Sequence, residues 1–126
     1  MKELGFNIDF APDADVITNS GNTVIGNRSF GEDPRLVGAM ASQVVKGLQD
    51  NGVSACLKHF PGHGGTVEDS HEGRAYTDKT LEEMEAEELV PFQEGIKQSL
   101  ISSWQGISPY RNPWGMIRPR HSQSRF

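Results

Sequence analysis

Apolar residues in the first 99 positions fall into two short runs and two helical periods. The runs at 5–10 and 53–57 predict strands, and the second is of the fully buried type. Between them, an apolar stripe recurs at helical spacing over Val37, Met40, Ala41, Val44, Val45 and Leu48. This stripe predicts a helix that starts at Pro34 behind an Asp33 N-cap and ends at Asn51-Gly52.

A second helix is predicted after the long loop that covers residues 58–77. Thr80 and Glu83 have the spacing of a capping box. Pro91 should break or kink this helix, and a shorter helical piece should continue to about Gln98.

The order strand, loop, helix, strand, loop, helix predicts an α/β fold of parallel strands with helical crossovers. Two such units cannot close a sheet or cover both of its faces. We therefore interpret residues 1–99 as a slice of an incomplete (β/α)8 TIM-type barrel.

Residues 100–126 differ from this body. They contain four arginines, both tryptophans and no acidic residue, and they show no apolar period. Read one frame over with permitted codons, the segment gives DFIMAGHISLPESVGDDTPASLSVTI, which begins like a buried strand. We predict an irregular, frameshifted, non-homologous tail that does not pair with the last strand; the alternative is a genuine basic tail.

Composition excludes several classes of function. The net charge of −5 argues against general binding to nucleic acid. No apolar run is long enough to span a membrane, and the first residues do not form a signal peptide. A single cysteine, Cys56, excludes an internal disulfide framework, and we expect it to be buried.

Asp69 and His71 are the most informative candidates for chemistry. At positions i and i+2 of a loop, their side chains can meet. A carboxylate beside an imidazole fixes the tautomer and favours the protonated ring, which makes a general acid near neutral pH. The alternative is a solvated Asp and His without a task.

Other polar residues also follow the predicted strands. Lys58 and His59 end the second strand. They either bind a sugar or a phosphate, or form an ion pair that only holds loops together. Arg28 either anchors a loop or binds substrate. We expect Asp9, Asp13 and Asp15 to be turn and backbone partners. Another possibility is a metal site formed by His59, His63, His71 and Asp69, but their spacing fits no compact zinc motif, so no metal or other cofactor is predicted.

Three motifs resemble glycoside hydrolase family 3, specifically its bacterial β-N-acetylhexosaminidases. They are NIDFAPDADV (7–16), IGNRSFGEDP (25–34) and KHFPGHGGTVEDSH (58–71). The DSH ending disfavours the β-glucosidase branch of the family. The resemblance covers about residues 1–99 and corresponds to the middle of a (β/α)8 catalytic domain.

The resemblance implies a role for each matching residue. Arg28, Lys58 and His59 would bind N-acetylglucosamine at the non-reducing end, His71 would be the general acid/base, and Asp69 would orient it. The substrate would be a terminal β-linked N-acetylglucosamine of peptidoglycan fragments or chitin oligosaccharides, hydrolysed with retention of configuration. The family's Asp nucleophile has no matching motif here, so we expect this chain alone to be inactive, a remnant with at most weak sugar binding, and marginally folded.

Overall fold

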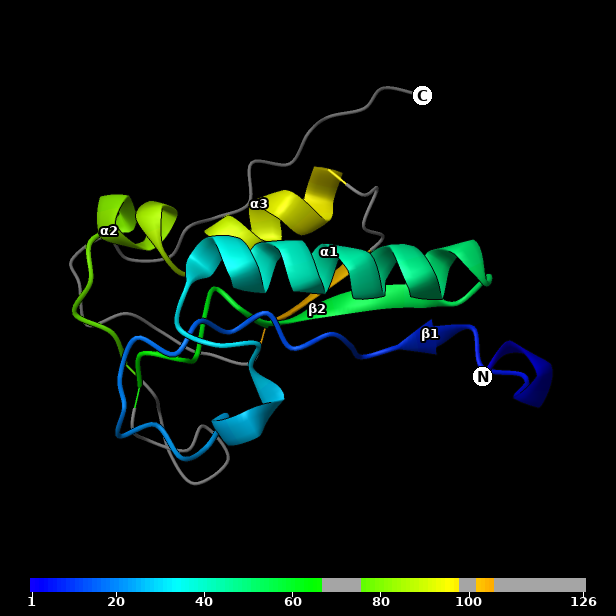
Figure 1. Cartoon of the computed structure of the whole chain (residues 1–126), viewed down its shortest axis with the longest axis horizontal. Coiled ribbons are helices and arrows are strands. Elements are labelled where there is room, and N and C mark those ends of the chain that lie inside the picture. Colours follow the sequence, from blue (N-terminus) through cyan, green and yellow to red (C-terminus); the bar gives the residue numbers. More distant parts are fainter. Residues whose placement is uncertain (67–75, 98–101, 106–126) are drawn as a thin grey trace.

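The computed structural model describes residues 1–66, 76–97 and 102–105, the last of these by their backbone (Figure 1). Three parallel strands form one sheet in the order β1 (Ile8–Asp9), β2 (Ser54–Phe60) and β3 (Ser102–Gln105). Helices connect successive strands, so the predicted α/β class with parallel strands and helical crossovers is confirmed.

The third strand corrects the expectation for the tail. Its backbone pairs in parallel with β2, with Cys56 opposite Ser102 and Phe60 opposite Gln105. Backbone groups supply these hydrogen bonds whatever the side chains are, so the missing apolar pattern did not exclude a strand here. The prediction that the segment would not pair with the last strand is wrong for 102–105.

Helix α1 (Pro34–Asp50) has the predicted bounds. The Asp33 side chain accepts a hydrogen bond from the Arg35 backbone N–H at 2.8 Å, which caps the helix. Val37, Ala41 and Val45 of the predicted stripe are fully buried, but Met40 is 45% exposed. The buried face is centred closer to Gly38 and Ser42 than the stripe indicated, which leaves Met40 at its edge.

The second helical region is divided in two, as Pro91 indicated. Helix α2 (Leu81–Ala86) starts with the predicted capping box of Thr80 and Glu83. Helix α3 (Val90–Lys97) follows after a short turn. Pro91 is the second residue of α3, where its missing N–H costs no helical hydrogen bond.

Two short 3-10 helices, η1 (Lys2–Leu4) and η2 (Gly26–Arg28), complete the described elements. Among the described residues, no helix is long and apolar enough to cross a membrane.

The core lies between the helices and β2. Figure 1 shows α1 and α3 next to each other along the same side of the strands, and both contact β2. A cluster of small and large apolar side chains fills this space: Ala14, Ala41, Val45, Ala55, Leu57 and Phe92. Cys56 is buried, as predicted.

The side chains around β1 are exposed by contrast. Phe6, Ile8 and Phe10, at alternate positions, are 54, 38 and 51% exposed.

The second strand is longer than the sequence pattern indicated. The apolar run ends at Leu57, but the strand continues through Lys58 and His59 to Phe60. Its extra residues are held by packing and by backbone contacts with a distant segment. Phe60 makes an edge-to-face contact with Phe92 of α3, with ring centroids 5.2 Å apart.

Candidate active site

The carboxyl end of β2 meets the loop that follows β1. The Lys58 backbone N–H donates to the Pro12 carbonyl at 3.2 Å, and the Ala14 N–H donates to the Lys58 carbonyl at 2.6 Å. Because these bonds continue the parallel ladder beyond β1, they bring Asp13 and Asp15 next to His59. The site is therefore built by two segments more than 40 residues apart.

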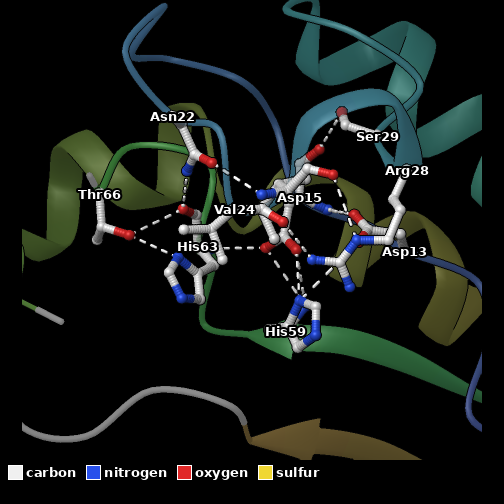
Figure 2. A network of polar contacts seen from close by, with 10 residues as sticks. Asp13, Asp15, Asn22, Val24, Arg28, Ser29, His59, His63 and Thr66 are labelled. Atoms are coloured by element: carbon white, nitrogen blue, oxygen red, sulfur yellow. Dashed lines mark hydrogen bonds and ion pairs between the residues drawn. The ribbon is translucent and has the colours of Figure 1, made fainter. Parts of the chain in front are cut away.

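Asp15 is the centre of this site. It is fully buried, and one of its oxygens, Oδ2, lies 2.7 Å from Nδ1 of His59. The other oxygen, Oδ1, accepts the backbone N–H of His63 at 2.6 Å. Figure 2 shows this one carboxylate placed between the two histidine residues. Asp15 thus links the end of β2 to the glycine-rich loop that follows it.

This contact determines which nitrogen of His59 is available to a ligand. A buried carboxylate requires a proton on Nδ1 of the imidazole, and Nε2 is then left as an acceptor in the neutral ring or as a second donor in the charged ring. The His59 side chain is only 16% exposed, so its orientation is fixed by its surroundings. The arrangement presents one defined imidazole nitrogen to a polar ligand.

Asp13 lies beside this pair with one oxygen satisfied. Its Oδ1 accepts the Asp15 backbone N–H at 3.0 Å, as expected for a turn residue. Its Oδ2 is buried without a hydrogen-bond partner among the described residues and lies 3.9 Å from Nδ1 of His59. Burial, and next the charge of Asp15, raise the pKa of the Asp13 carboxyl to about 7. Asp13, Asp15 and His59 each place one donor atom within 4.8 Å of the others.

Hydrogen bonds hold the loop after β2 against the loop after β1. Asn22 donates its side-chain amide to the His63 carbonyl at 2.7 Å, and Asn19 donates to the Gly65 carbonyl at 3.4 Å. Gly64 approaches the chain so closely that a Cβ there would lie 1.8 Å from the Val16 carbonyl oxygen. This backbone contact therefore requires glycine at position 64.

A buried acid supports the same loop from the helical side. Glu88 is 3% exposed, and its carboxylate is paired with the Lys79 ammonium and accepts the Thr18 hydroxyl at 3.2 Å. Its side chain fills the space over Gly62, where a Cβ would lie 2.6 Å from it. Partial burial lowers the pKa of Lys79, but hydrogen bonds with Glu87 and Glu88 and their charges together outweigh this effect, so the pKa is raised. The loop is thus held between the β1 loop and Glu88.

The structure places some of the site residues predicted from the sequence in this site, and others lie elsewhere or outside the described residues. His59 is at the centre of the site, and Lys58, half-buried, precedes it in β2. Arg28 lies in η2 and is exposed, and its guanidinium donates to the Val24 and Ile25 carbonyls at 2.7 and 3.3 Å. Asp69 and His71 lie outside the described residues, so their pairing stays a prediction.

Sequence reasoning missed the importance of Asp15, which was expected to serve only turn and backbone partners. It does accept backbone N–H groups, but from His59 and His63 rather than from its own turn. Its place after the first strand was the available signal, since polar residues at carboxyl ends of parallel strands gather at one edge of a sheet. His63 is buried with its Nδ1 2.5 Å from the Thr66 hydroxyl, and its ring centroid lies 6.0 Å from that of His59.

Comparison with proteins of known sequence identifies the relatives of this chain. It is 47% identical over 96 residues to the β-hexosaminidase of Stenotrophomonas maltophilia, which covers 76% of this chain and 28% of that protein. It is 46% identical over 101 residues to the β-hexosaminidase LpqI of Mycobacterium tuberculosis, covering 80% of this chain and 26% of LpqI. The chain thus spans less than a third of the length of these relatives.

Solved structures that resemble this chain include β-N-acetylglucosaminidases. A glycoside hydrolase family 3 β-N-acetylglucosaminidase from Paenibacillus superimposes with a TM-score of 0.82 at 40% identity, covering 86% of this chain and 21% of that one. NagZ from Neisseria gonorrhoeae, in complex with N-trifluoroacetyl-D-glucosamine, superimposes with a TM-score of 0.75 at 36% identity, covering 82% and 30%. Residues 1–103 match the glycosyl hydrolase family 3 N terminal domain. The chain, with its Asp15–His59 site at the ends of parallel strands, therefore belongs to glycosyl hydrolase family 3.

Proposed function

We propose that this chain corresponds to the central part of a (β/α)8 barrel, and that the complete barrel hydrolyses terminal β-linked N-acetylglucosamine with retention of configuration. The parallel strands with helical crossovers support the barrel. The exposed apolar side chains around β1 support it further, because a neighbouring barrel unit would cover them.

The observation that carries the proposal is the double contact of Asp15. One carboxylate orients the imidazole of His59 and also holds the backbone of His63, where the loop toward Asp69 and His71 begins. The proposed sugar-binding residue His59 and the start of the loop that leads toward Asp69 and His71 are thus held by the same carboxylate. Catalysis by positioned groups needs this kind of shared, rigid support.

In the proposed reaction, His71 protonates the glycosidic oxygen as the leaving group departs, and Asp69 orients its ring. An Asp nucleophile forms the covalent glycosyl intermediate, and His71 then removes a proton from the attacking water. An imidazole as acid adds no second negative charge near the nucleophile, which must stay ionised.

Arg28, Lys58 and His59 would bind the N-acetylglucosamine unit. Arg28 and Lys58 supply charged donors, and His59 presents Nε2 as its outward nitrogen, so hydroxyl and carbonyl oxygens of a sugar are suitable partners. The N-acetylglucosamine analogue bound to the NagZ relative supports this substrate class.

A second candidate is an inactive remnant with weak sugar binding, and it applies to the 126 residues taken alone. The proposed nucleophile lies well downstream of the loop that contains His71, whereas no aspartate follows Asp78, the residue directly after that loop. We expect the isolated chain to release no more 4-nitrophenol from its N-acetyl-β-D-glucosaminide than a His71→Ala variant. A reproducible difference between the two would contradict the remnant.

A chimaera tests the proposed activity of the complete barrel. The segment of the Stenotrophomonas β-hexosaminidase that aligns with this chain over 96 residues is replaced by the corresponding residues of this chain. We expect the chimaera to cleave the N-acetylglucosaminide in preference to the glucoside. His71→Ala should lower kcat by about 10²–10⁴-fold, the usual contribution of general acid–base catalysis.

The matched control for the chimaera is Asp78→Asn, because Asp78 is exposed and follows the same loop. It should leave kcat unchanged. Equal losses in both variants, or a preference for the glucoside, would overturn the assignment of the dyad or of the substrate.

A further inference from the structure

We propose that Glu88 is a positioning residue for the acid/base pair Asp69 and His71, and that it acts by holding the glycine-rich loop after β2 (residues 61–66) in place. The motifs and the proposed reaction give no task to Glu88. The catalytic part of the proposal rests on the proposed hydrolytic function, whereas the contacts that carry it lie among the described residues.

Glu88 lies directly against the glycine-rich loop. It belongs to the turn between α2 and α3 and is buried. A Cβ on Gly62 would lie 2.6 Å from Cβ and Cγ of Glu88, and a Cβ on Gly65 would lie 3.4 Å from its Oε1. The stem and the carboxylate of one side chain therefore both contact the loop, so a displacement of Glu88 would displace the loop.

The carboxylate also connects the loop to two other segments. Its Oε1 accepts the Thr18 hydroxyl at 3.2 Å and the Lys79 ammonium. Lys79 donates to the same Thr18 oxygen at 3.2 Å, so the three side chains form a closed triangle of hydrogen bonds. A Cβ on Gly65 would lie 2.8 Å from this Thr18 oxygen. The triangle thus lies against the glycine-rich loop and ties it to the loop after β1.

Stability alone does not explain a buried ion pair at this position. Oε2 of Glu88 is buried without a hydrogen-bond partner in the described part of the chain, which adds to the cost of burying the carboxylate. An apolar pair of similar volume is often as stable as a buried ion pair, or more stable. An apolar pair cannot, however, accept the Thr18 hydroxyl in one fixed direction. The charged pair therefore serves the geometry of the loop rather than its burial.

This loop leads to the predicted acid/base pair. In its middle, His63 donates its backbone N–H to Asp15 at 2.6 Å, and the chain then continues toward the pair. His59 is held by its own contacts with Asp15, which do not pass through Glu88. Loss of the triangle should therefore displace the acid/base pair more than His59, and so lower kcat more than it changes KM.

The test uses the chimaera with the Stenotrophomonas β-hexosaminidase and the double variant Lys79→Met/Glu88→Met. Methionine keeps the approximate volume of both side chains and removes both charges. We expect an unchanged or higher melting temperature, as is common when an apolar pair replaces a buried ion pair. We expect kcat to be about 10–100-fold lower, because small displacements of catalytic groups are costly. KM should change by less than about threefold, because binding through His59 is retained.

Two further variants separate the role of the acceptor oxygen from that of charge elsewhere on the helix. Glu88→Gln keeps an acceptor oxygen on a side chain of the same shape, so it should retain most of kcat. Glu85→Gln, an exposed acid of α2, is the matched control and should have normal kcat. A normal kcat in the double variant, or a loss of kcat that accompanies a large loss of melting temperature, would show that Glu88 only stabilises the fold and would overturn the proposal.

Hydrogen exchange gives a readout that does not require activity. In the chimaera labelled with ¹⁵N-histidine, the His63 amide should exchange about tenfold faster in the double variant, because its hydrogen bond to Asp15 is less well held. An unchanged exchange rate would contradict the hold of Glu88 on the loop. If the unaltered chimaera has no activity, the proposed function fails, and the exchange at His63 alone decides whether Glu88 positions the loop.

Discussion

Asp15 holds His59 by two contacts, one to the ring nitrogen Nδ1 at 2.7 Å and one to the backbone N–H at 3.3 Å. The two residues are 44 positions apart and come from the loop after β1 and from β2. Since Asp15 also accepts the His63 N–H, its carboxylate joins three parts of the site.

Replacing Asp15 with Asn should disturb both the ring and the loop. Asn retains the shape, but it removes the charge that favours a proton on Nδ1. We expect ¹⁵N spectra to show a lower Nδ1–H fraction at His59, and urea unfolding to show a loss of about 1–3 kcal/mol, typical of a buried group left imperfectly paired. Asp50→Asn is the control; unchanged His59 spectra in Asp15→Asn would disprove the positioning role.

Asp13 should make the stability of the chain depend on pH. Its carboxyl pKa is about 7 in the folded chain and near 3.8 without the fold, so between these values the folded state binds more protons. Its contribution to stability is therefore complete below about pH 4 and is lost as the pH rises through 7. In EDTA, Asp13→Asn should raise the melting temperature more at pH 8 than at pH 5, and an equal gain at both values would count against the shift.

Gly64→Ala should disrupt the loop that leads to the predicted dyad. The added Cβ would lie 1.8 Å from the Val16 carbonyl oxygen, a backbone atom that cannot move away without separating the two loops. We expect a marked drop in melting temperature and faster proteolysis of the loop. Gly47→Ala is the matched control, since it has open space around it in α1 and should be neutral or stabilising. Similar behaviour of both variants would contradict the close contact.

Lys79→Met should destabilise the fold, because it leaves the buried Glu88 carboxylate without its cation. Lys79 is the cation paired with this carboxylate, whose side chain is 4% exposed. Breaking a buried ion pair from one side typically costs about 3–5 kcal/mol, because a buried charge is left without its partner. The double variant Lys79→Met/Glu88→Gln should recover part of this loss in urea unfolding. If the double variant is no more stable than Lys79→Met, the pair does not determine the stability of this loop.

Features determined by neighbours in sequence were predicted well. Asp33 and Thr80 cap helices by accepting N–H groups two or three residues away, and Pro91 marks the boundary between α2 and α3. The motifs also gave the family, which the comparisons confirm. Met40 was wrongly placed in the core because a helical stripe gives a period but not the position of the neighbouring helix.

The helices, their caps, the α/β class and membership of the family could all be predicted from the sequence, because each depends on short-range spacing or on motif letters. By contrast, the extension of β2 to Phe60, its pairing with residues 102–105 and the central place of Asp15 became clear from the folded chain. Those features depend on hydrogen bonds between segments about 40 residues or more apart. The local sequence around a carboxylate or a backbone N–H does not indicate its hydrogen-bond partner when that partner is distant in the chain, because folding alone brings the two groups together.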